Sequence, residues 1–306
     1  MNRQRIIPHL WFDTQAKEAA AFHIAAFGGD SAVTNITTIS DTPSGEVDIV
    51  QFKLLGHRFM SISAGPFFRI NPSISFFVNF DPAQRADAKE ALDALWVKLA
   101  ESGQVLMPLD SYPFSARYGW VEDKYGVSWQ LILTNPAGEP RPAIIPSLLF
   151  TNEVCGRAEE AMKFYTEVFR DTRVGMVARY GPDMAPDREG TVMFANFMLQ
   201  GQWFAAMDSA NPHEFSFNEA ISLVVNCATQ DEIDYFWKAL SAVPEAEQCG
   251  WLKDRFGISW QIVPAKMGEL MGGTTEQRAR VTRAFLKMKK FDIAALEAAY
   301  AGQPAA

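Results

Sequence analysis

One twelve-residue segment of this chain occurs twice. GWVEDKYGVSWQ at residues 119–130 returns as GWLKDRFGISWQ at residues 250–261, and seven of the twelve positions are identical. The likeness extends to two further pairs of segments: IIPHLWF (6–12) with IIPSLLF (144–150), and SISFFVN (73–79) with AISLVVN (220–226). Three matched pairs in the same order indicate a tandem duplication, and a duplicated chain is constrained to fold as copies of one pattern.

Each copy has the same coarse order of elements. In the first copy, a short apolar run (6–12) predicts a strand, apolar residues near helical spacing (14–28) predict a helix, and three strand-like runs follow up to residue 63. The order of strand, helix and three strands then recurs up to residue 133. Each copy therefore contains two βαβββ units, and the pattern predicts an α+β protein.

Proline and glycine separate the two copies in the segment TNPAGEPRPA (134–143). We therefore predict a first domain at residues 1–136 and a second domain at residues 142–264. The remainder, residues 265–306, is predicted to be a helical C-terminal extension, with Thr274 or Thr275 capping one helix and Asp292 capping the next. Because the extension carries several large apolar residues, we expect it to pack against a domain.

Composition and charge restrict the partners. The chain has 28 basic and 36 acidic residues and a net charge of −8, which argues against binding to a phosphate backbone. It has no apolar run long enough to cross a bilayer, and its first residues lack the pattern of a secretory signal. We therefore expect a cytoplasmic protein with a small-molecule ligand and with no nucleic-acid or membrane partner. A homodimer is left open.

The motifs of both copies resemble a known group of proteins. The βαβββ repeat, the helix ending FYTEVF (164–169) and the ending D(K/R)(F/Y)G(V/I)SWQ resemble the vicinal oxygen chelate superfamily, which includes glyoxalase, bleomycin-resistance and dioxygenase proteins. Within it they resemble the PhnB-like branch, labelled 3-demethylubiquinone-9 3-methyltransferase-like. The resemblance implies tandem glyoxalase-like domains, each of two βαβββ units that form a curled mixed-sheet cup for a ligand or a metal.

The resemblance also implies a metal position, and the residues found there argue against a metal. Metal-binding relatives carry a glutamate where this chain has Gln130 and Gln261, and a first-strand histidine that corresponds to His9 in one copy and to Ser147 in the other. A neutral amide holds a divalent cation more weakly than a carboxylate does. We therefore expect no metal and no other cofactor.

Candidate site residues come from the predicted cups. Strand alternation directs the serine and the glutamine of each SWQ ending to one side of the last strand and the tryptophan to the other. The residues expected to bind a ligand are aromatic and amide side chains and one strand histidine: His9, Asn79, Trp120, Gln130, Asn226, Trp251 and Gln261. Asp208 and His213, close together at a predicted turn, are the candidates for a catalytic pair. His23, at the position of Tyr165 in the second copy, is expected to pack on a helix face.

Three functions compete. The first is metal-free binding of a small organic ligand, as on the bleomycin-resistance side of the superfamily. The second is an enzyme of the lyase, isomerase or dioxygenase type, using a weakly held divalent metal or the pair Asp208 and His213. The third is the methyltransferase of the branch label, but the sequence has no glycine-rich strand-to-helix turn and no alternating βα order. We expect the first function.

Overall fold

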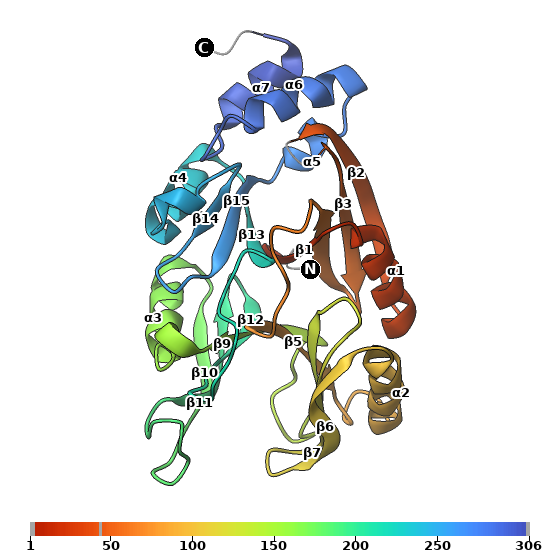
Figure 1. The fold of residues 1–306 in the computed structure, drawn as a ribbon, viewed down its shortest axis with the longest axis vertical. Coiled ribbons are helices and arrows are strands. Elements are labelled where there is room, and N and C mark those ends of the chain that lie inside the picture. The colour runs from red at the N-terminus through yellow and green to blue at the C-terminus, as the bar shows by residue number, and fades with distance from the viewer. Residues whose placement is uncertain (1–3, 43–44, 304–306) are drawn as a thin grey trace.

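The computed structural model describes residues 4–42 and 45–303, which form two mixed sheets (Figure 1). The seven-stranded sheet contains, in spatial order, β14 (Trp251–Lys253), β15 (Ser259–Pro264), β13 (Ile221–Cys227), β1 (Ile6–Phe12), β4 (His57–Ser63), β3 (Gly45–Leu54) and β2 (Ala32–Thr42). The eight-stranded sheet contains β10 (Arg173–Arg179), β11 (Val192–Leu199), β12 (Gln202–Asp208), β9 (Ile144–Phe150), β5 (Ile74–Phe80), β8 (Ser128–Leu133), β7 (Ser115–Glu122) and β6 (Gln104–Tyr112). The predicted α+β class is confirmed.

The two sheets do not coincide with the two sequence copies. The first unit of the first copy, β1 to β4, joins the second unit of the second copy, and β1 runs antiparallel to β13 with His9 opposite Ser222. The eight-stranded sheet joins the remaining two units, with Ser75 on β5 opposite Ser147 on β9. Each sheet is therefore built across the copies, whereas the sequence analysis placed one cup within each copy. Both sheets are also open and end in edge strands, where curled cups were expected.

The short connection between the copies accounts for this pairing. β8 ends at Leu133 and β9 begins at Ile144, and in the sheet only β5 lies between these two strands. A connection of this length keeps the units on either side of it in one sheet, because neighbouring units in sequence tend to be neighbours in space. The first and last units are then left to pair with each other.

Helices cover one face of each sheet (Figure 1). The seven-stranded sheet packs against α1 (Ala16–Phe27) and α4 (Gln230–Leu240), and the eight-stranded sheet against α2 (Ala88–Ala100) and α3 (Ala158–Val168). The tryptophans of the two SWQ endings, Trp129 and Trp260, are buried in the large apolar core that includes residues of these helices. Strand alternation therefore directs Gln130 and Gln261 to the opposite face, which we call the inner face of each sheet.

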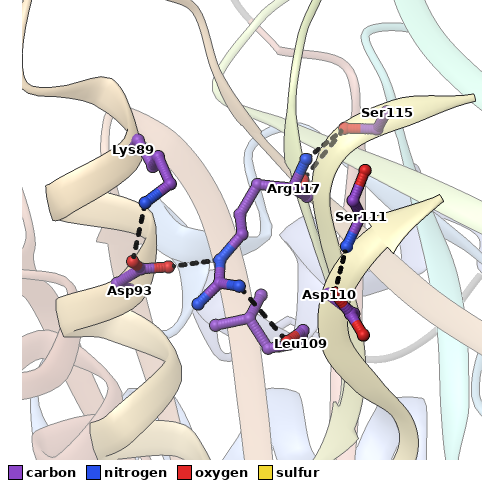
Figure 2. A network of polar contacts seen from close by, with 7 residues as sticks. All are labelled: Lys89, Asp93, Leu109, Asp110, Ser111, Ser115 and Arg117. Atoms are coloured by element: carbon purple, nitrogen blue, oxygen red, sulfur yellow. Dashed lines mark hydrogen bonds and ion pairs between the residues drawn. The ribbon is translucent and has the colours of Figure 1, made fainter.

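Figure 2 shows how the helix-covered face is tied together at the edge of the eight-stranded sheet. Arg117 on β7 donates from Nε to Asp93 Oδ1 on α2 (2.7 Å) and from a guanidinium nitrogen to the carbonyl of Leu109 on β6 (3.3 Å). Asp93 also pairs with Lys89 one turn away (3.7 Å). Because Arg117 points toward α2, Tyr118 and the alternate residues after it point to the inner face.

The repeated turn is held by a buried aspartate. Asp123 Oδ1 accepts from the backbone nitrogens of Tyr125 (2.8 Å) and Val127 (3.2 Å). Its Oδ2 accepts from Trp129 Nε1 (2.8 Å) and from His23 Nε2 (2.6 Å). A carboxylate that accepts four hydrogen bonds orients the turn, the last strand and the first helix together.

The second copy repeats this arrangement around Asp254. Its carboxylate accepts from the backbone nitrogens of Phe256 and Ile258, from Trp260 Nε1 and from Tyr165 Oη (2.6 Å). Gly126 and Gly257 have φ values of +82° and +89°, a region that residues with a Cβ rarely adopt. The repeated segment is therefore a folding signature, and His23 packs as expected while also taking the hydrogen-bonding place of Tyr165.

The C-terminal extension consists of α5 (Met267–Leu270), α6 (Thr275–Phe285) and α7 (Ile293–Ala301). The predicted caps are confirmed, since Thr274 forms a capping box with Gln277 and Asp292 accepts from Ala295. The extension connects both edges of the seven-stranded sheet: α6 packs on β2, and the backbone before β14 donates to the segment between α6 and α7 (Figure 1). No helix among the described residues has the length and apolar character needed to cross a membrane.

Candidate functional site

The inner face of the eight-stranded sheet has a buried polar centre around Gln130. This side chain is 1% exposed, and its amide is held at both ends. Its Oε1 accepts from Tyr118 Oη (2.6 Å), and its Nε2 donates to Ser75 Oγ (2.8 Å). The amide orientation is therefore set before any ligand arrives.

Ser147 lies beside this centre and lacks a partner. It is 0% exposed, and its Oγ makes no hydrogen bond. Ser147 stands opposite Ser75 in the β5–β9 pair, so both hydroxyls share the inner face with Gln130. A buried hydroxyl without a hydrogen-bond partner lowers folding stability by about 1–3 kcal/mol and is rare. Ser147 is therefore a position where another molecule could supply the missing partner.

Apolar side chains surround the polar centre. They form a separate cluster of aromatic, methionine and aliphatic residues: Phe77, Met107, Tyr112, Tyr118, Trp120, Ile132, Ile145, Phe194, Met198, Trp203, Ala205 and Met207. Phe77 and Phe194 meet edge to face at 5.7 Å between ring centroids. Trp120 is half-buried and donates from Nε1 to Ser128 Oγ (2.6 Å). Its indole therefore covers part of the inner face.

The inner face of the seven-stranded sheet has a different centre. Gln261 donates from Nε2 to His9 Nδ1 (2.8 Å) and to Ser222 Oγ (2.9 Å). Because an amide nitrogen only donates, His9 carries its proton on Nε2. Burial lowers the pKa of His9 to about 3, so the ring is neutral. Trp251 packs edge to face on His9 at 5.7 Å.

The structure therefore divides the predicted ligand residues between two faces. His9, Trp251 and Gln261 lie together on the seven-stranded sheet although they come from different copies, and Trp120 and Gln130 lie together on the eight-stranded sheet. Asn79 is not part of either centre. Its Nδ2 donates to the carbonyl of Pro142 (2.8 Å) and anchors the connection between the copies.

Asn226 likewise lies at a strand end. It follows Val225 at the end of the β1–β13 pairing, and its backbone nitrogen donates to the carbonyl of Arg5 (3.2 Å). It pairs with Val263 rather than with Gln261 in the register of β13 and β15. The two asparagines were predicted as amides that orient a ligand. The side chain of Asn79 binds the connection between the copies instead, and Asn226 lies beside Arg5 through its backbone.

The predicted catalytic pair does not form. Asp208 accepts through Oδ1 from the backbone nitrogens of Gly156 (2.8 Å) and Ala158 (3.1 Å), and through Oδ2 from Val192 (2.9 Å). His213 instead contacts Ser209 Oγ through Nε2 (2.8 Å). The two side chains thus have different hydrogen-bond partners, because proximity in sequence does not determine where a carboxylate points. Asp208 fastens the start of α3 to the sheet.

The donor set on either inner face does not suit a divalent metal. In the seven-stranded sheet, Gln261 already uses its amide nitrogen on His9 and Ser222, and no carboxylate belongs to this centre. In the eight-stranded sheet, both ends of Gln130 are engaged. Across the part of the chain that the structure describes, no group of three or more His, Cys, Asp or Glu side chains has metal-binding geometry. The absence of a metal stays a prediction.

Two cavities of the structure are lined by residues other than the glutamines. A cavity of about 570 Å³ borders Arg157, Asp254 and Phe256, and one of about 320 Å³ lies between α1 and α2. Gln261 is only 8% exposed. Both polar centres are therefore covered by other side chains, and the half-buried Trp120 is one of those that cover the eight-stranded face.

Sequence analysis did not select Ser75, Ser147, Ser222 and Tyr118 as site residues. The serines lie at alternate positions of apolar strands, a pattern that also fits ordinary packing. Tyr118 immediately precedes the repeated segment and aligns with Cys249, a difference that could have drawn attention to it. Tyr118 and Ser75 meet Gln130, and Ser222 meets Gln261, within one copy. Only Ser147 joins its centre through the pairing of β5 and β9 across the copies.

Fold and site together define a tandem glyoxalase-like protein. Glyoxalase I from Zea mays matches with a TM-score of 0.50 and 11% identity, over 85% of this chain and 94% of that chain, a likeness that shows the fold alone. The PhnB protein of Bacillus cereus is 35% identical over 43% of this chain and 100% of its own length, with a TM-score of 0.38. A glyoxalase-related enzyme from Fulvimarina pelagi is 16% identical over 43% of this chain and 88% of that chain, with a TM-score of 0.29.

The family model described as 3-demethylubiquinone-9 3-methyltransferase matches twice, at residues 4–132 and 142–263. The chain therefore belongs to this family. The two matches confirm the tandem duplication. No match was found among curated proteins.

Proposed function

We propose that this protein binds a small organic ligand on the inner face of the eight-stranded sheet, without a metal ion. The observation that carries the proposal is Ser147, whose buried hydroxyl has no partner and lies next to the fixed amide of Gln130. A ligand with a hydroxyl or carbonyl group would form a hydrogen bond with that hydroxyl. The pairing of one unsatisfied polar group with an oriented amide is a usual way to fix a ligand in a mostly apolar site.

The apolar surroundings support a flat ligand. Phe77, Trp120 and Trp203 belong to the cluster around the polar centre, and three methionines complete it. Methionine adapts its shape to what it contacts, and aromatic rings stack on planar groups. The ligand's body is therefore aromatic or otherwise apolar, with one polar group directed to Ser147.

The competing enzymatic proposal lacks its expected residues. Asp208 is occupied by three backbone nitrogens, and the donors around Gln130 include no carboxylate that would hold a metal beside it. The methyltransferase of the family label also lacks support, since both sheets are mixed and no alternating βα order appears in the strand sequence. Ligand binding needs neither a metal nor a cofactor.

Equilibrium dialysis with 2-naphthylmethanol, followed by naphthalene fluorescence, tests the proposal. We expect binding that is equal with and without EDTA, and about tenfold weaker binding by Ser147→Ala, because one hydrogen bond to a buried group is worth about 1.4 kcal/mol. Ser222→Ala is the matched control, since it removes a buried strand hydroxyl from the other sheet and should leave binding unchanged.

Three results would count against the proposal: no binding of the alcohol, loss of binding on chelation, or equal weakening by both serine variants. The melting temperature gives an independent check on the metal. A metal at 100 times its dissociation constant would stabilise the fold by about 2.7 kcal/mol, so EDTA should leave the melting temperature unchanged.

A further inference from the structure

A row of small side chains crosses the inner face of the eight-stranded sheet. In the printed strand registers Asn196 faces Ala205, Ala205 faces Ser147, and Ser147 faces Ser75. Ser128 stands one residue before Trp129, which pairs with Phe76, so Ser128 continues the row beside Ser75. Four of these five side chains are serine or alanine and all five are buried, and the unpartnered Ser147 hydroxyl lies in the middle of this row.

The row ends at a carboxylate. Glu122 on β7 is paired with Ser128 on β8 and, by alternation with Trp120, points to the inner face. It is half-buried, and no ion pair to it is present among the described residues. Burial raises the pKa of Glu122, while exposed Arg69 lowers it and Asp123 raises it further. A partly desolvated carboxylate that forms no ion pair favours a positively charged or hydrogen-donating partner.

The matching position on the other sheet has the opposite charge. Lys253 stands in the second copy where Glu122 stands in the first, and it is neutralised by Glu219 at 2.7 Å. In the first copy the residue equivalent to Glu219 is Pro72, which cannot supply a charge. The second copy therefore pairs the charge on its inner face with a carboxylate, whereas Glu122 has no ion pair among the described residues and is influenced by the exposed Arg69.

Two arginines lie near the other end of this sheet. Arg141 and Arg173 stack on Trp203 at 3.8 and 4.6 Å from the ring centroid, and both pair with Glu139. Trp203 belongs to β12, four strands from β7, which is roughly 19 Å at ~4.8 Å per strand. These arginines therefore do not neutralise Glu122.

We propose that the eight-stranded inner face selects an organic amine, whose ammonium group binds Glu122 and whose apolar body extends along the row of small residues toward Ser147. In such a ligand the group that contacts Ser147 is a second polar group. This inference rests on the proposed function and adds the charge of the ligand. Trp120, which lies between Glu122 and Tyr118 on the inner side of β7, supplies a ring face that attracts the same cation. The contact predicted at Glu122 is a charge-assisted hydrogen bond.

Three probes that differ only in their polar group test the proposal: 2-naphthylmethylamine, 2-naphthylmethanol and 2-naphthoate. We expect the wild-type protein to bind the ammonium at least about tenfold more tightly than the carboxylate, since a charge-assisted hydrogen bond is worth that ratio or more. Glu122→Gln should reduce this ratio of affinities to about threefold or less, because it weakens the binding of the ammonium probe. Lys253→Gln, the matched variant on the other sheet, should leave the ratio unchanged.

The outcomes separate the two proposals. If none of the three probes binds, the proposed function fails and the amine proposal fails with it. If the probes bind with equal affinity, or if Glu122→Gln keeps the wild-type ratio, only the selection of an amine is overturned. A ratio that changes in Lys253→Gln and not in Glu122→Gln would move the charged site to the seven-stranded sheet and would likewise overturn it. The melting temperature of each variant verifies that it is folded.

Discussion

His9 carries an imidazole that is 3% exposed and accepts a hydrogen bond from an amide. Burial lowers its pKa to about 3, and nothing around it supplies the negative charge that would reverse this effect. The unfolded chain binds a proton at this residue below about pH 6.5, whereas the folded chain does not. Between about pH 3 and pH 6.5, folding therefore requires His9 to lose its proton.

The free energy of unfolding should fall as the pH drops from about 6.5 toward 3. At pH 5 the contribution of His9 is a loss of about 2 kcal/mol relative to pH 7, because one pKa unit corresponds to about 1.4 kcal/mol. His57, whose pKa burial lowers to about 4, adds to the loss. Urea unfolding at the two pH values should show a smaller difference for His9→Gln than for the wild-type protein. If the free energy of unfolding changed equally between the two pH values in both proteins, the assignment of this pH dependence to His9 would be refuted.

At the scale of the element, the C-terminal extension acts as a connection between the edges of the seven-stranded sheet. Leu296 and Val281 are fully buried, and Phe291 packs so closely on Gly250 that a Cβ there would lie 2.5 Å from the ring. Backbone nitrogens of Cys249 and Gly250 donate to Met288 and Lys289 (2.8 and 2.7 Å). These contacts combine apolar burial with strand-like hydrogen bonds.

Truncation after Pro264 should therefore lower the melting temperature, since it exposes the surface beneath the extension and removes burial worth about 1.5–3 kcal/mol for each large side chain. In the full chain, Phe291→Ala should cost about 3 kcal/mol, and Tyr235→Ala, at a half-exposed ring, should cost less. Thermal and urea unfolding measure both effects. A truncated protein that melts at the wild-type temperature would show that the extension contributes nothing to stability.

At the scale of the whole molecule, the pairing of units across the copies makes each copy incomplete. In residues 1–136 alone, β1 would lose β13 and β5 would lose β9. Two central strands with almost wholly buried residues would become open edges, which associate or aggregate. Crossed loops add to the interdependence, because Asn71 donates to the carbonyl of Ser216 (3.1 Å) and Asn218 to that of Arg69 (2.8 Å).

Residues 1–136 expressed alone should therefore fail to form a stable monomer, whereas co-expression with residues 142–306 should give a folded 1:1 complex. The missing strands and the lost apolar burial are the physical reason. Light scattering after size exclusion, with circular dichroism, distinguishes the outcomes. A folded, monomeric first copy would mean that the units can pair within one copy, as the sequence analysis supposed.

The sequence by itself determined the features that depend on nearby residues. The repeat, the connection at 134–143 and the caps Thr274 and Asp292 follow from local spacing and side-chain chemistry. The predicted βαβββ order holds for three of the four units, whereas the last unit has only β14 and β15 after its helix. The shared Asp, Gly and Trp of the repeated segment also belong to this group, because they build a turn within a few residues of one another.

The tertiary structure alone decided which units share a sheet, and thereby which side chains meet. His9 joins Gln261 rather than Gln130, Ser147 is left without a partner, and Asp208 turns to backbone nitrogens instead of His213. Strand patterns show which face of a strand is apolar, but four similar units offer several pairings with similar patterns. The short connection between β8 and β9 selects among them, because it holds the units on either side of it in one sheet.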